Sequence, residues 1–225
     1  MSEPKEIKPR GSTLSFRRIL ISLLLIAMIP GVRAALNLLI HDDLISLTFA
    51  LCLSGFLLVV YDWNLFGLHY NRSKRNIGDT LLYSLLGTAV IGTWTWVDQS
   101  FLYGNLLQPS TAAMKAFPFA APAALIATSY VLAVIVNIGF KCLTDHIDVR
   151  SNEAAVILVS GFLFGAILTL LYTPFDLDIW IRTYLYNVIL TAFLSYLYNQ
   201  SSSFIPGILS MGTVLLVVNL LPLLK

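Results

Sequence analysis

The chain has 225 residues, of which 57% are hydrophobic and 12% are charged, and its net charge is +2. A soluble domain carries about 25% charged residues, so this composition excludes an ordinary soluble enzyme or binding domain. The sequence also has no glycine-rich phosphate loop and no basic patch with interleaved aromatic residues, so we expect no nucleic-acid partner.

Several apolar runs of 18 or more residues match the ~20-residue length of a helix that crosses a bilayer. Because backbone amides in hydrocarbon must pair internally, we expect an all-α, polytopic transmembrane helical bundle. Seven spans are predicted, at approximately 19–40, 44–61, 80–97, 119–140, 153–174, 178–198 and 204–224.

These spans divide the chain into three parts. Residues 1–18 form a polar cytoplasmic tail, residues 19–118 hold the first three spans and an outer segment, and residues 119–225 hold the last four spans. Pro30 and Gly31 are expected to kink the first span. The outer segment 98–118 is irregular, and is predicted to be a connecting loop or a re-entrant piece.

The positions of lysine and arginine predict the orientation. Ten of them fall in the amino-terminal tail and in alternate loops, whereas only Lys115 and Lys225 fall on the other side. We therefore expect a multi-pass protein of the plasma membrane, with a cytoplasmic amino terminus, an extracytoplasmic carboxyl terminus and contact with anionic lipid.

Metal and acid–base chemistry find little support in the sequence. His41 is predicted to lie outside and His69 and His146 in inner loops, so the three histidines cannot share one metal. No Asp or Glu lies deep in a predicted span, and no buried His or Lys accompanies the serines and threonines there. Hydrolysis is therefore not expected, and neither is a metal or a cofactor.

Polar residues inside a membrane often carry function, and otherwise form hydrogen bonds to a neighbouring helix. The candidates are Arg33, which is expected to pair with nearby aspartates, and Asn137 and Asn187, each expected to bond another helix. Gly161 and Gly165 are four residues apart, a spacing that lets two helices approach closely, and we expect them to pack within the chain.

The carboxyl-terminal half contains three segments with recognisable spacing: Val136-Asn137-Ile138-Gly139-Phe140-Lys141, then Phe164-Gly165-Ala166-Ile167-Leu168, then a third beginning at Pro206. Their order resembles the CAAX-protease and bacteriocin-processing family of membrane proteins, whose pattern is E-E-x-x-x-R, F-x-x-x-H and H-x-x-x-N. The framework positions are retained. The positions of the family's catalytic side chains hold Val136, Asn137, Lys141, Leu168, Met211 and Leu215.

This resemblance implies a four-span core of the family's fold in residues 119–225, without the catalytic groups. Active members of the family cleave prenylated substrates or process peptides, whereas others confer bacteriocin immunity or regulate cell-wall enzymes by binding. The sequence thus predicts a non-catalytic scaffold or regulator that binds a membrane or membrane-anchored protein. The alternatives are an intramembrane CAAX-type endopeptidase with a non-standard site, and a small-molecule transport component with Arg33, Asn137 and Asn187 along a path.

Overall fold

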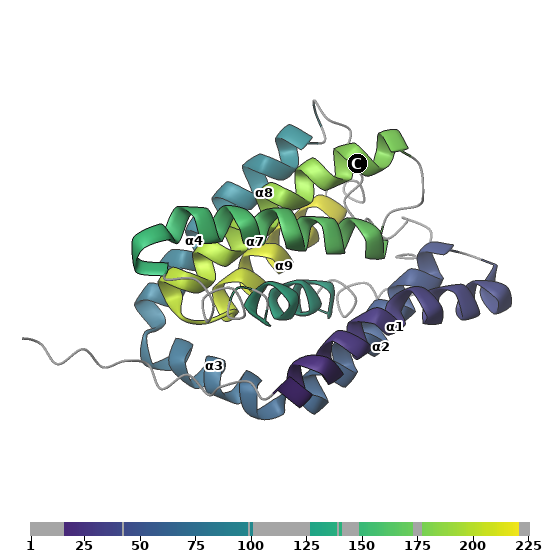
Figure 1. The fold of residues 1–225 in the computed structure, drawn as a ribbon, viewed down its shortest axis with the longest axis horizontal. Coiled ribbons are helices and arrows are strands. Elements are labelled where there is room, and N and C mark those ends of the chain that lie inside the picture. The colour runs from purple at the N-terminus through teal and green to yellow at the C-terminus, as the bar shows by residue number, and fades with distance from the viewer. Residues whose placement is uncertain are drawn as a thin grey trace, which may run out of the picture.

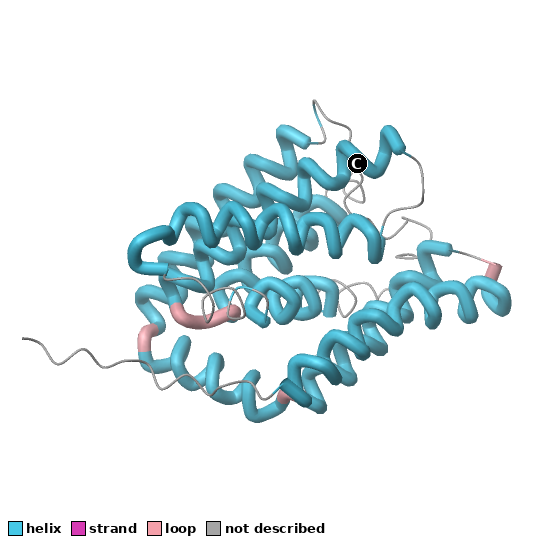
Figure 2. Tube along the Cα trace, viewed as in Figure 1, coloured by secondary structure: helices cyan, strands magenta, loops and turns pink. Residues whose placement is uncertain are grey.

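Every regular element in the described part of the chain is helical, as Figure 2 shows, so the expected all-α fold class is confirmed. The computed structural model describes residues 16–41, 43–98, 100, 127–138, 140, 149–172 and 177–220. The labelled helices are α1 (Phe16–Ile40), α2 (Asp43–Tyr61), α3 (Trp63–Arg75), α4 (Ile77–Val97), α7 (Val149–Tyr172), α8 (Leu177–Ser201) and α9 (Ile205–Leu220). A further helix, Ala127–Ile138, is called the buried helix below.

Several of these helices have the length and apolar composition needed to cross a membrane. Among the described residues, three pass on both counts: Leu20–Ile40, Ile77–Val97 and Glu153–Leu170. Helices α2 and α3 add a fourth only if they count as one bent span. The buried helix is about 18 Å long, at 1.5 Å per residue, against about 30 Å of hydrocarbon. The number of seven spans therefore remains a prediction.

Three helix pairs form the bundle: α1 with α2, α4 with α9, and α7 with α8. Helix α8 also contacts α4 and α9, which joins two of these pairs. The buried helix lies in the middle of the view, below α9 and beside the α1–α2 pair (Figure 1). Every side chain from Thr128 to Ile138 is buried, so neighbouring elements cover this helix on all its faces.

Helix α3 is a correction to the sequence prediction, which placed Arg72, Lys74 and Arg75 in a loop between two spans. The segment is instead a 13-residue helix that turns through 81° from α2. Its buried positions, Leu65, His69 and Ser73, are four residues apart and therefore share one face. This amphipathic helix crosses one end of the bundle, as its place along the lower edge of Figure 1 shows.

The α7–α8 pair is packed closely through the two glycines predicted to serve that purpose. A Cβ atom at Gly161 would lie 2.8 Å from the Cβ of Ala192, and one at Gly165 would lie 2.8 Å from the backbone nitrogen of Val188. Only glycine leaves room for this separation of the two backbones. The expectation that Gly161 and Gly165 pack within the chain is confirmed.

Candidate functional site

The buried helix carries the first of the positions that the family resemblance singles out. Val136 is 1% exposed and Asn137 is 2% exposed, near the carboxyl end of the helix. Around them the helix is almost wholly apolar, so Asn137 is a polar group that must find a partner inside the protein.

That partner is His69, from α3. The side-chain amide nitrogen of Asn137 lies 3.4 Å from Nε2 of His69, where the amide donates to the ring nitrogen when the imidazole proton is on Nδ1. His69 itself is only 2% exposed. The prediction that His69 lies in an inner loop was therefore wrong, because α3 carries this side chain inward from a segment that is polar in sequence.

The turn between α8 and α9 completes this polar cluster. The hydroxyl groups of Ser73 and Ser203 are 3.0 Å apart, and the Ser203 hydroxyl also lies 3.3 Å from the backbone oxygen of His69. The backbone N–H of Ile205 donates to the Ser203 oxygen at 3.2 Å. Ser203 thus bonds the first backbone N–H of α9 and joins this helix to α3.

One end of α3 is fixed to the same turn. A guanidinium nitrogen of Arg72 donates to the backbone oxygen of Ser202 at 3.1 Å. Ser202 adopts φ 51°, a left-handed conformation that lets the chain reverse sharply between α8 and α9. The carbonyl at this turn is thereby bonded by a cation 130 residues earlier in the sequence.

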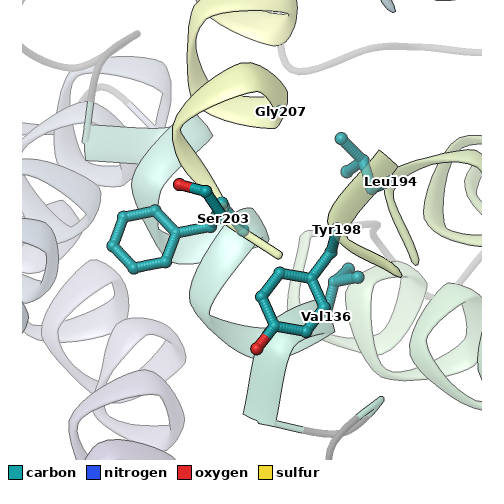
Figure 3. A pocket seen from close by; sticks show the side chains of 7 residues that line it. Val136, Leu194, Tyr198, Ser203 and Gly207 are labelled. Carbon is teal, nitrogen blue, oxygen red and sulfur yellow. The ribbon is translucent and has the colours of Figure 1, made fainter. Parts of the chain in front are cut away.

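A small pocket, with room for about one water molecule, lies next to this cluster (Figure 3). Two of its lining residues are near His69, whose ring centroid is 4.2 Å from that of Phe204 and 6.0 Å from that of Tyr198. In Figure 3, the Tyr198 ring lies beside Val136, while the Ser203 oxygen points away from Tyr198. The lining residues are Ala133, Val136, Leu194, Tyr198, Ser203, Phe204 and Gly207.

The other positions compared with the family's catalytic residues are apolar and buried where they are described. Leu168, Met211 and Leu215 are each no more than 2% exposed and belong, with Val136, to one apolar core cluster. None of these three lines the pocket. Their mutual contact stays a prediction, and Lys141 lies outside the described residues.

A buried carboxylate, which the sequence did not predict, lies at the break between α2 and α3. Asp62 is 1% exposed, and one of its oxygens accepts a 3.0 Å hydrogen bond from Ser22 of α1. Burial raises the pKa of the Asp62 carboxyl, and this hydrogen bond and the charge of Arg18 only partly offset the effect. The other oxygen of Asp62 and the hydroxyl of Tyr130 are buried and have no hydrogen-bond partner among the described residues.

The remaining predicted polar candidates lie apart from this cluster. The amide of Asn187 donates to the hydroxyl of Thr169 at 3.0 Å, which is the helix-to-helix hydrogen bond expected of it. Arg33 lies half-buried in α1, and Asp42, one of its two proposed partners, lies outside the described residues. Within the part of the chain that the structure describes, no three His, Cys, Asp or Glu side chains gather in a way that could hold a metal.

A comparison of this chain with protein-family models, with curated proteins and with solved structures found no match. The resemblance to the CAAX-protease and bacteriocin-processing family therefore depends on the sequence segments quoted above.

Two signals in the sequence point to the residues that the prediction missed. Leu65, His69 and Ser73 repeat every four residues, which is a helical spacing within an otherwise polar segment. Asp62 comes directly after an apolar run and directly before Trp63, a position typical of a helix break at a membrane face. Neither signal names a partner, since His69 and Asn137 are 68 residues apart in sequence.

Proposed function

We propose that this chain is a non-catalytic membrane protein that acts by binding another membrane or membrane-anchored protein, as a scaffold or regulator. One observation carries the proposal. Val136, Leu168, Met211 and Leu215, the apolar side chains at positions where the family has catalytic groups, are each at most 2% exposed within one apolar core. A hydrolytic site needs a carboxylate or imidazole and room for water at such positions.

The His69–Asn137 pair is the observation that favours the alternative, an endopeptidase with a non-standard site. Its chemistry fits structural support better. The Ser203 oxygen accepts from the Ile205 N–H and lies near Ser73 and the His69 backbone, so its hydrogen-bonding capacity is used in joining α3 to α9. A serine nucleophile needs its hydroxyl bonded to the base itself.

A transport role has one observation in its favour, the buried Asp62 at a helix break. Transporters of this kind place broken helices and ion-binding residues near the middle of the bilayer. Ser22, which bonds Asp62, is the third residue of the candidate span Leu20–Ile40. This break is therefore at a membrane face, and Asn137 and Asn187 are each occupied by an interhelical hydrogen bond.

We also propose a plasma-membrane location with a cytoplasmic amino terminus and an extracytoplasmic carboxyl terminus. Supporting this, the contact of Ser22 with Asp62 puts the start of α1 beside the start of α3. Helix α3 then turns through 81° from α2 and crosses that end of the bundle, so Arg17 and the basic last turn of α3 lie at the same end. Reporter fusions at the two termini test the orientation, and both termini on one side would contradict it.

The test of the binding function uses the full chain, tagged and expressed at its natural level. Cross-linking in intact cells, mild-detergent purification and mass spectrometry should recover a defined membrane or membrane-anchored protein, and the tagged partner should recover this chain in return. Failure of that reciprocal recovery would count against a binding function.

A second assay separates binding from proteolysis. The purified chain is incubated with a prenylated peptide, and we expect no cleavage. The variants His69→Ala and Asn137→Ala are compared with Asn187→Ala, which instead removes a hydrogen bond between α7 and α8. Cleavage that the first two variants abolish and the third retains would overturn the non-catalytic proposal.

A further inference from the structure

Helix α3 is held in a fixed orientation relative to the rest of the protein. His69 packs on Phe204, Ser73 contacts Ser203, and Arg72 donates to the backbone of Ser202. These contacts occupy one face and one end of the helix. The opposite face of α3 is therefore presented outward at a defined angle.

That angle suits a helix lying along a membrane surface. Helix α3 turns through 81° from α2, and α2 pairs with α1, which contains the candidate span Leu20–Ile40. A helix almost perpendicular to a membrane-crossing helix runs parallel to the bilayer plane. Amphipathic helices in that position place aromatic and apolar groups at the headgroup level and basic groups toward the phosphates.

The outer face of α3 has this composition. Trp63 is 64% exposed and Tyr70 is 53% exposed, and Lys74 and Arg75 are exposed in the last turn. Tryptophan and tyrosine are the aromatic residues enriched at the interface between hydrocarbon and water. The two cations also lie at the negative end of the helix dipole, which favours positive charge at this position. The dipole does not account for the exposed aromatic residues.

The basic character continues beyond α3 at its other end. Arg17, in the first turn of α1, is exposed, and the Ser22–Asp62 hydrogen bond brings that end of α1 to the start of α3. Among the described residues, acidic side chains at this end are few: Asp62 is buried, Glu153 accepts hydrogen bonds from α8, and Asp79 is exposed at the start of α4. The described residues of the outward surface thus present more positive than negative charge.

We propose that the outer face of α3, with Arg17 at one end and Lys74 and Arg75 at the other, binds the anionic lipid headgroups of the bilayer that α1 and α2 enter. The occupant is a lipid headgroup layer because the surface combines exposed aromatic residues with spread, exposed cations. It therefore lacks the enclosed, hydrogen-bonded cradle that would hold a single free anion.

The test titrates the purified full chain in neutral detergent with phosphatidylglycerol or phosphatidylcholine and measures bound lipid by native mass spectrometry. The chain should prefer phosphatidylglycerol. Each basic residue near an anionic surface raises the affinity for that surface about five-fold. The triple variant Arg17→Gln, Lys74→Gln, Arg75→Gln should therefore weaken phosphatidylglycerol binding about 100-fold. Phosphatidylcholine binding should not change.

Arg182→Gln is the matched control. Arg182 is also exposed, but it lies about 29 Å along α8 from the end that contacts α3, at 1.5 Å per residue. An undiminished lipid preference in the triple variant, or an equal loss in the control, would overturn the proposal. So would displacement of phosphatidylglycerol by inorganic phosphate at the same headgroup concentration, which indicates an ion site.

A second measurement covers the case in which the triple variant does not fold. In the unmodified chain, raising the salt concentration should abolish the preference for phosphatidylglycerol, because exposed charges are screened within a few ångströms at high ionic strength. A preference that persists in high salt would contradict an electrostatic surface.

Discussion

The α7–α8 pair and the α1–α2 pair are both antiparallel helix pairs, but different interactions hold them together. Glycines bring the backbones of α7 and α8 together, and polar side chains link them along their length. These links are Ser160 to Ser195, Thr191 to the Gly161 oxygen, Asn187 to Thr169, and Asn199 to Glu153. Close packing and repeated hydrogen bonds therefore act over most of this interface.

Two polar links at the α1–α2 pair involve serine side chains, and no pair of glycines brings these two backbones together among the described residues. Ser54 donates to the Leu25 oxygen at 2.9 Å, and Ser22 donates to Asp62. Gly55 of α2 faces Ala127 of the buried helix and so serves a different interface. Because lipid is as apolar as these side chains, apolar burial alone does not drive helices together in a bilayer. We therefore expect the α7–α8 pair to resist separation on unfolding more than the α1–α2 pair does.

The largest expected effect is Gly165→Leu, which should lower the free energy of unfolding by about 3 kcal/mol. The new Cβ would meet the backbone of Val188 at 2.8 Å, and a backbone cannot rotate away as a flexible side chain can. The matched control is Gly31→Leu in α1, where the added Cβ would meet nothing within 4 Å beyond its own helix backbone and chain neighbours. Reversible unfolding in detergent measures both, and equal losses would show that the close approach of α7 and α8 is not what holds them.

A cavity in the core should cost somewhat less. Leu168→Ala should lower the free energy of unfolding by about 2 kcal/mol, by analogy with soluble cores, because Leu168 is buried in the main apolar cluster. Leu24→Ala in α1 should change it little, since Leu24 is 57% exposed. A similar small loss at both positions would mean that Leu168 faces lipid.

A substitution at the polar end of the α1–α2 pair, where Ser22 bonds Asp62, should also lower the free energy of unfolding. Ser22→Ala should cost about 1 kcal/mol, because the buried Asp62 loses the one hydrogen bond that the structure gives its side chain. The same unfolding measurement detects it. A loss as large as that of Gly165→Leu would reverse the expected ranking of the two pairs.

Asp62 should also make stability depend on pH. Its pKa in the folded protein is raised by burial, so the folded state holds the proton more tightly than the unfolded state. The contribution is fully present below the unfolded value of about 3.9 and is lost as pH rises through the folded pKa. Asp62→Asn should remove this part of the pH dependence, and unfolding at pH 4 and pH 7 measures it. An unchanged pH profile would contradict a buried, titrating carboxyl.

The smallest effects should come from single hydrogen bonds along α7 and α8. Asn187→Leu and Thr191→Val should each cost about 0.6 kcal/mol, the average for such bonds in membrane proteins. The double variant should lose about the sum. Losses several times larger would mean that these bonds, and not the glycines, determine the strength of the pair.

The sequence by itself determined the all-helical class and the approximate positions of the apolar helices. Hydropathy over about 20 residues is a local property of the sequence, and the bilayer thickness sets that length. It also identified the close contact at Gly161 and Gly165, since small residues four apart share one helix face. Asn187 could be assigned an interhelical hydrogen bond because a buried amide in hydrocarbon has no water to bind.

Only the tertiary structure decided where the polar side chains meet. His69 and Asn137 are 68 residues apart, and Ser73 and Ser203 are 130 apart, so no local pattern links them. Their contact depends on the 81° turn after α2, which lays a polar segment across the end of the bundle and carries a histidine into it. The burial of Asp62 has the same cause: its neighbours come from α1 and from the buried helix, whose positions are set by packing and not by adjacent sequence.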